Sequence, residues 1–120
     1  PISILLSQNK IFGNSTVTLA HSRTSNLEEL CLDSDLIISA IGKPEFIKGD
    51  MVKKGSTIID VGITRVDDSS SHKGYRIAGD VDFNSVSSRV GFITPVPGGV
   101  GPMTIAMLLK NTLKACSLSD

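Results

Sequence analysis

SDLIISAIG, residues 34–42, and STIIDVGI, residues 56–63, decide the fold of this chain. Each is a short, nearly continuous run of apolar residues that carries glycine at or near its end. A strand in a half-exposed sheet alternates between apolar and polar residues, whereas a strand buried on both faces does not. The two runs therefore predict strands of a parallel sheet that is covered on both sides.

The segment before these strands alternates between the two patterns of secondary structure. Residues 1–10 have apolar side chains at helical spacing, and residues 15–22 are β-branched and strand-like. Ser25 and Glu28 have the spacing of a capping box, which predicts a short helix after them.

The segment after the first strand continues the alternation. Residues 43–55 predict a polar connection with a helical turn, and residues 64–76 predict a solvated loop. Residues 91–96 are expected to form a last strand, followed by a helix at 103–116 that is apolar around most of its circumference. The whole pattern indicates the α/β class, with a Rossmann-like parallel sheet and helices on both faces.

Composition excludes several functions. The chain has 120 residues, enough for one domain, and its 12 basic and 12 acidic residues cancel without forming a basic stripe. No apolar run approaches the length of a membrane span. We therefore expect no nucleic-acid or membrane partner. We also expect no metal: Asp60, Asp80 and Asp82 lack the spacing of a ligand set, and turn or capping roles are favoured for them.

Ligands of parallel α/β sheets bind beyond the carboxyl ends of the strands. In this sequence those ends are residues 21–24, 40–42, 60–63 and 94–101, and three of the four contain glycine. Glycine lets the backbone approach a flat ligand closely. This edge is therefore the expected binding site.

The first of these ends reads HSRT, residues 21–24. A domain that binds NAD usually places an acidic residue here for the ribose hydroxyls, whereas an arginine accommodates the 2′-phosphate of NADP. Ser22 and Arg23 supply a hydroxyl and a guanidinium with no acid beside them, so NADP fits better than NAD. The alternative is a polar loop in which Ser25 only caps the next helix.

The last end, TPVPGGVGPMT at residues 94–104, combines stiffness with missing side chains. Pro95 and Pro97 restrict the backbone, and Pro102 suits the first position of the following helix. The alternative is a tight turn from strand to helix, but a turn needs only one or two glycines and this segment has three. Close approach of a ligand accounts for the excess.

Four motifs together resemble one family: HSRT (21–24), IGKPEFIKGDMVKKGSTIIDVGI (41–63), GDVDF (79–83) and TPVPGGVGPMTIAMLL (94–109). In order and approximate spacing they are similar to the NADP-binding domain of bifunctional methylenetetrahydrofolate dehydrogenase/methenyltetrahydrofolate cyclohydrolases. The resemblance covers essentially the whole chain. It implies oxidation of 5,10-methylenetetrahydrofolate with NADP, then hydrolysis of the methenyl product to 10-formyltetrahydrofolate.

The resemblance also implies roles for particular residues. Ser22 and Arg23 would contact the adenosine ribose or its 2′-phosphate, and Ile63 and Thr104 would contact the nicotinamide end. The folate side of the cleft would be lined by Pro97, Gly98, Gly99, Val100 and Gly101. The family's catalytic lysine and its tyrosine partner lie in an amino-terminal domain, so no catalytic residue is assigned here, and Tyr75 is not a substitute.

The resemblance further predicts that 1–120 is a single partial domain. The first strand, the glycine-rich phosphate loop and the amino-terminal catalytic domain would precede Pro1, and the fragment alone would be inactive. The alternative is a non-catalytic chain that folds only with the rest of the protein and binds no nucleotide alone. A homodimer is expected, in the cytoplasm, with the mitochondrial matrix also compatible.

Overall fold

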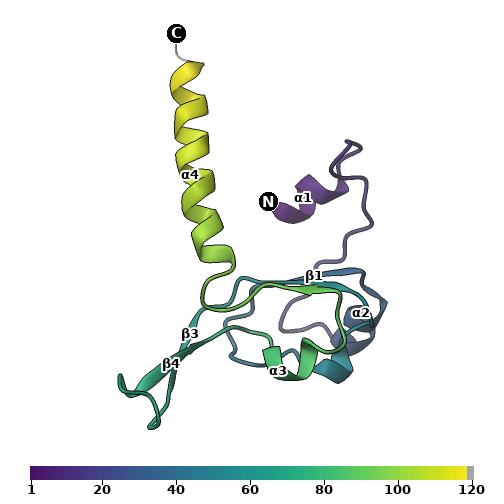
Figure 1. Ribbon diagram of the computed structural model, residues 1–120. Coiled ribbons are helices and arrows are strands. Elements are labelled where there is room, and N and C mark those ends of the chain that lie inside the picture. The colour runs from purple at the N-terminus through teal and green to yellow at the C-terminus, as the bar shows by residue number, and fades with distance from the viewer. Residues whose placement is uncertain (119–120) are drawn as a thin grey trace.

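The computed structural model describes residues 1–118 and contains a small parallel sheet, a β-hairpin and several helices (Figure 1). The helices are α1 (Ile2–Ser7), α2 (Leu27–Asp33), α3 (Phe83–Val86), α4 (Val100–Ser117) and the 3-10 helix η1 (Gly49–Met51). The strands are β1 (Leu36–Ser39), β2 (Thr57–Asp60), β3 (Thr64–Asp67), β4 (Tyr75–Ala78) and β5 (Phe92–Ile93). The helical turn expected within 43–55 is η1.

The sheet has three parallel strands in the order β1-β2-β5. Ile37, Ile58 and Ile93 are aligned across it by the register of the two strand pairs. The two apolar runs at 34–42 and 56–63 thus form neighbouring parallel strands, which confirms the α/β class. Because the strands run in the same direction, the segments that follow Ser39, Asp60 and Ile93 all leave from one edge of the sheet.

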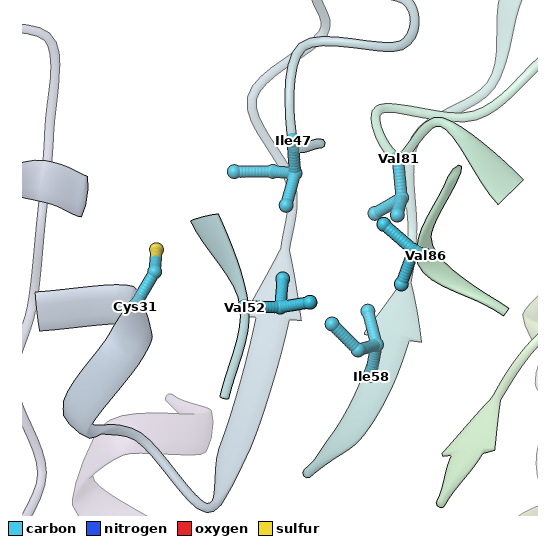
Figure 2. Close-up of a cluster of buried hydrophobic side chains, with 6 residues drawn as sticks. All are labelled: Cys31, Ile47, Val52, Ile58, Val81 and Val86. Atoms are coloured by element: carbon cyan, nitrogen blue, oxygen red, sulfur yellow. The ribbon is translucent and has the colours of Figure 1, made fainter. Parts of the chain in front are cut away.

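The hydrophobic core lies on one face of this sheet (Figure 2). Its buried members come from α2, β2, α3 and the connections between them: Cys31, Ile47, Val52, Ile58, Val81 and Val86. Burial raises the pKa of the Cys31 thiol, as desolvation does for an acid that becomes negatively charged when it loses its proton. Helices α2 and α3 both pack against η1. Within residues 1–118 the helices therefore cover one face, and the prediction of helices on both faces is wrong for this part of the chain.

Helix α4 extends away from the body of the molecule and buries none of its residues (Figure 1). Several of its large apolar side chains are exposed: Met103, Ile105, Leu108, Leu109 and Leu113. The prediction of a mostly buried helix is wrong here because the described residues provide no surface against this apolar side. No helix within 1–118 combines the length and the hydropathy that crossing a membrane would require.

The strand predicted at 15–22 does not form. Residues 15–20 are exposed and make no ladder with the part of the chain that the structure describes. Backbone in extended conformation becomes a strand only when a neighbour supplies hydrogen bonds. The next helix also begins differently from the prediction, because α2 has Asn26 at its N-cap and no side-chain capping bond.

The segment 64–76, expected to be a loop, contributes most of the antiparallel hairpin β3–β4. Its strands alternate between half-buried and more exposed positions, a period of two that the serine-rich turn obscures in the sequence. The turn is held by Asp68, which accepts bonds from the Ser70 amide and hydroxyl, and the hydroxyl bond lowers the pKa of Asp68. Arg65 lies 4.2 Å from the centre of the Tyr75 ring, so this tyrosine has a structural contact in the hairpin.

Candidate cofactor and substrate site

A cavity of about 290 Å³ opens at the carboxyl edge of the sheet. Its walls are residues 60–63 at the end of β2, residues 95–99 after β5, and the first turn of α4 with Thr104. Seven of the nine predicted site residues line it: Ile63, Pro97, Gly98, Gly99, Val100, Gly101 and Thr104. The fold therefore brings together two segments that are more than thirty positions apart in the sequence.

The loop between β5 and α4 has a backbone that side chains would obstruct. The Val96–Pro97 peptide bond is cis, and Gly98 has a φ of +103°, which L-residues rarely adopt. A Cβ atom on Gly99 would lie 2.5 Å from the Pro95 carbonyl oxygen. These two glycines are thus required by the turn itself, as the simpler interpretation of the motif proposed.

Gly101 is different, because apart from its chain neighbours and the backbone of its own helix no atom lies within 4 Å of the position its Cβ would take. It is the second residue of α4, whose N-cap is Gly99 and whose start has no side-chain cap. The first amide groups of a helix have no partner within the helix, so they can donate to a ligand. Pro102 lies at the third position of α4, two residues later than predicted, where its missing N–H is still of no consequence.

Two further predicted residues, Ile63 and Thr104, also line this cavity. Thr104 faces it from α4, and its hydroxyl donates to the Val100 carbonyl at 3.1 Å. Ile63 is exposed, directly after the buried Gly62. Both side chains can therefore contact a bound molecule without a rearrangement of the core.

Ser22 and Arg23 lie outside the cavity, in an exposed turn. The turn is closed by His21, whose amide bonds to the Thr24 hydroxyl at 3.0 Å and whose ring Nδ1 accepts the Arg23 amide at 3.2 Å. Both polar side chains thus project from a local, hydrogen-bonded turn. The structure does not bring this pair together with the seven cavity residues.

For three aspartates the sequence favoured turn or capping roles over metal binding. In the structure their carboxylates accept hydrogen bonds from backbone amides. Asp60 and Asp80 are buried and accept hydrogen bonds from amide groups at the strand ends, and Asp82 accepts from the Ser85 amide at the start of α3. The capping role is confirmed for Asp82, and Asp60 accepts the Gly62 amide within its own turn. The turn or capping role predicted for Asp80 is wrong, because its carboxylate accepts only from residues distant in the sequence. No group of three or more potential metal ligands occurs among residues 1–118.

A second, smaller cavity of about 150 Å³ shares Asp60 and Val96 with the first. On its wall the Glu45 carboxylate and the Arg76 guanidinium form an ion pair at 2.9 Å, and this hydrogen bond raises the pKa of Arg76. Sequence reasoning missed this pair, because the two residues meet only through the packing of the hairpin beside residue 45. No local signal in the sequence predicts it.

A parallel α/β sheet with a ligand-sized cavity beyond its carboxyl ends, built from glycine-rich strand-to-helix turns, defines the class of nucleotide-binding α/β domains. The comparison with protein families is more specific. The family model for the tetrahydrofolate dehydrogenase/cyclohydrolase NAD(P)-binding domain matches residues 1–120. The chain belongs to this family, as its NAD(P)-binding domain.

Related sequences agree with the assignment. The bifunctional protein FolD of Flavobacterium johnsoniae is 66% identical over 115 residues, which are 96% of this chain and 39% of that protein. FolD of Protochlamydia amoebophila is 60% identical over 120 residues, 100% of this chain and 41% of the relative. The chain thus spans about two fifths of the length of the curated relatives it matches.

Solved structures show the same fold. The methylenetetrahydrofolate dehydrogenase of the silkworm Bombyx mori superposes with a TM-score of 0.84 at 46% identity, covering 98% of this chain and 40% of that one. The Trypanosoma brucei dehydrogenase-cyclohydrolase (FolD), solved with NADP cofactor and an inhibitor, gives 0.80 at 47% identity, covering 88% and 36%. The family resemblance inferred from the sequence is thus confirmed.

Proposed function

We propose that this chain is the NADP- and folate-binding part of a bifunctional methylenetetrahydrofolate dehydrogenase/methenyltetrahydrofolate cyclohydrolase. The reaction is oxidation of 5,10-methylenetetrahydrofolate to the methenyl form, followed by hydrolysis to 10-formyltetrahydrofolate. The observation that carries the proposal is the cavity in which Ile63 meets the glycine–proline loop and Thr104. The family assignment supplies the reaction class.

The cavity suits the nicotinamide end of a dinucleotide. Its walls combine the apolar side chains of Ile63 and Val100 with the open backbone at Gly101. Such a surface can contact a flat ring through apolar atoms and bind its polar group through amides or the Thr104 hydroxyl. When bound there, NADP supplies the hydride acceptor for the folate carbon.

The proposed preference for NADP over NAD depends on Ser22 and Arg23. They lie exposed in a turn that carries no acidic side chain within residues 21–24. A guanidinium and a hydroxyl match the geometry of a phosphate, and an acid at this place would repel it. The relative from Trypanosoma brucei was solved with NADP, which supports the same choice.

The folate is proposed to lie beside the loop Pro97–Gly101, on the open side of the cavity. This part of the wall presents backbone rather than reactive side chains. The loop therefore positions the substrate, while the catalytic groups are expected in the part of the protein that corresponds to the remaining three fifths of the relatives. By itself the chain is expected to bind and orient, and to turn over nothing.

A second candidate function is a non-catalytic fragment that folds only with the rest of the protein. The exposed apolar side of α4 and the unpaired segment 15–20 favour it. The two candidates are compatible in one complete protein, because a domain can belong to an enzyme and still need its partner. Cytoplasmic location and a homodimer remain part of the proposal, on the basis of the family resemblance.

The test mixes the complete protein with 5,10-methylenetetrahydrofolate and either NADP or NAD. The reaction is monitored by the absorbance of the reduced cofactor. We expect reduction of NADP with a higher kcat/KM than of NAD, and appearance of 10-formyltetrahydrofolate. A folded, complete protein that reduces neither cofactor would refute the proposal. Formation of the methenyl product without its hydrolysis would refute only the cyclohydrolase half.

A further inference from the structure

Two buried carboxylates connect the strand ends that form the cavity edge. Asp60 is 3% exposed and Asp80 is fully buried. Burying a carboxylate costs free energy unless hydrogen bonds replace its hydration. In both residues each carboxylate oxygen accepts at least one hydrogen bond, and the donors lie at or just after the ends of β1, β2 and β4.

Asp60 binds the segment after β2 to the segment after β4. Its Oδ1 accepts the Gly62 amide at 2.9 Å and the Asp80 amide at 3.1 Å, and its Oδ2 accepts the Val81 amide at 2.9 Å. Its own amide donates to the Thr94 hydroxyl at 2.8 Å, which adds the end of β5. One residue therefore holds three chain segments in fixed relation.

Asp80 continues the connection to β1. Its Oδ2 accepts the Ile41 amide at 2.5 Å and the Ser39 hydroxyl at 3.3 Å, while its Oδ1 accepts the Gly42 amide at 3.0 Å. The residue also packs directly on Gly62, where an added Cβ would overlap Asp80 Cγ and Oδ1. Displacement of this carboxylate would therefore be transmitted to Gly62 and to Ile63 beside it.

From these contacts we propose that Asp60 and Asp80 are positioning residues for the nicotinamide end of the cofactor. They hold the backbone of 61–63, which lines the cavity, and tie it to residues 41–42 after β1. Asp80 acts through Gly62 and Asp60. The inference rests on the proposed function, since it assumes that NADP binds here. It adds a role for two residues that touch neither cofactor nor substrate.

A stabilising role alone would predict a different result from a positioning role. The turn with Ser22 and Arg23, proposed for the adenosine end, has no hydrogen bond to either carboxylate among those of the described residues. A displaced Asp80 should therefore disturb the nicotinamide end and leave the phosphate end intact. General loss of stability would weaken both ends equally, through the fraction of folded protein.

The experiment compares Asp80→Asn with wild type in the complete protein, well below the melting temperature. The asparagine amide would place a donor against the Ile41 or Gly42 amide, both donors themselves. We expect the Kd of NADP to rise by about tenfold or more, as loss of a hydrogen bond to a charged acceptor allows. The Kd of 2′-phospho-ADP-ribose, which lacks nicotinamide, should change by less than about twofold, within the effect of a neutral substitution.

Asp82→Asn is the matched control, because Asp82 lies two residues after Asp80 but caps helix α3 and makes none of the bonds at the edge of the sheet described above. It should leave both Kd values unchanged. If Asp80→Asn does not fold, Ser39→Ala is used instead, since it removes one hydrogen-bond donor from Asp80. It should raise the Kd of NADP by a smaller factor and leave the Kd of 2′-phospho-ADP-ribose unchanged. Equal weakening of both ligands, or no weakening, would overturn the positioning role. If wild type binds neither ligand, the proposed function fails and this inference fails with it.

Discussion

Single residues at the carboxyl edge of the sheet act mainly through backbone groups. Gly98 and Gly99 allow the turn into α4, Gly101 leaves space beside the helix start, and Asp60 fixes the amides around Gly62. Side chains that could contact a ligand directly are few. We therefore expect specificity for the cofactor to depend on the exposed turn at residues 21–24, as proposed above.

The double substitution Ser22→Asp with Arg23→Ala should shift preference from NADP toward NAD. It removes a guanidinium and a hydroxyl and adds a carboxylate that repels the 2′-phosphate. Each bond to a charged group is worth about 1.5–3 kcal/mol, so we expect the NADP:NAD ratio of kcat/KM to fall by at least about tenfold in the complete protein. An unchanged ratio, with Thr24→Ser as the control variant, would contradict this role.

At the scale of elements, α4 is rich in large apolar side chains and yet exposed to solvent. It has 18 residues, and its large apolar side chains are exposed. Exposed apolar surface of this extent usually marks a contact with another part of the protein. Since the relatives are more than twice as long as this chain, we expect the remainder of the protein to cover it.

Leu108→Gln with Leu113→Gln should therefore have opposite effects in two contexts. In the isolated chain the pair removes exposed apolar surface, so self-association measured by light scattering should fall. In the complete protein each buried leucine lost would cost about 2 kcal/mol or more, and the melting temperature should drop. Lys110→Gln, on the polar side of the same helix, is the control. An unchanged melting temperature of the complete double variant would show that α4 stays uncovered.

At the scale of the whole molecule, residues 1–118 form a compact part around the core and two parts that lie outside it. The core cluster and the parallel sheet make the compact part, whereas residues 1–20, which include α1, and helix α4 contain no buried residue (Figure 1). The turn at 21–24 directly follows the unpaired segment. Its position relative to the cavity is therefore not fixed by a strand ladder within the described residues.

The isolated chain should consequently bind NADP much more weakly than the complete protein. Holding two contact regions in fixed relation is worth affinity because the ordering cost is met before binding. We expect a Kd at least about a hundredfold higher for the isolated chain by calorimetric titration, which corresponds to roughly 2.7 kcal/mol. Equal affinities would show that the phosphate end of the site is complete within these residues.

Much of the site could be predicted from local patterns, and its long-range pairs could not. Gly98, Gly99 and Gly101 are recognisable because a turn and a close approach need a missing side chain, wherever the chain goes next. The hairpin was hidden by its serine-rich turn, although its strands alternate with a period of two. The ion pair between Glu45 and Arg76 has no local signal, because the two residues lie 31 positions apart in the sequence.

The sequence by itself determined the parallel α/β class and the strand-end segments 60–63 and 94–101, because apolar runs and glycine–proline turns act over short distances. The family and the individual site residues came from the resemblance of its motifs. The tertiary structure decided how those segments are joined. Buried carboxylates find their amide partners only when strand ends meet, and an apolar helix is buried only where a second surface exists. That is why the sequence suggested only a turn role for Asp80, whereas its carboxylate binds the amides of Ile41 and Gly42, which only the fold brings to it.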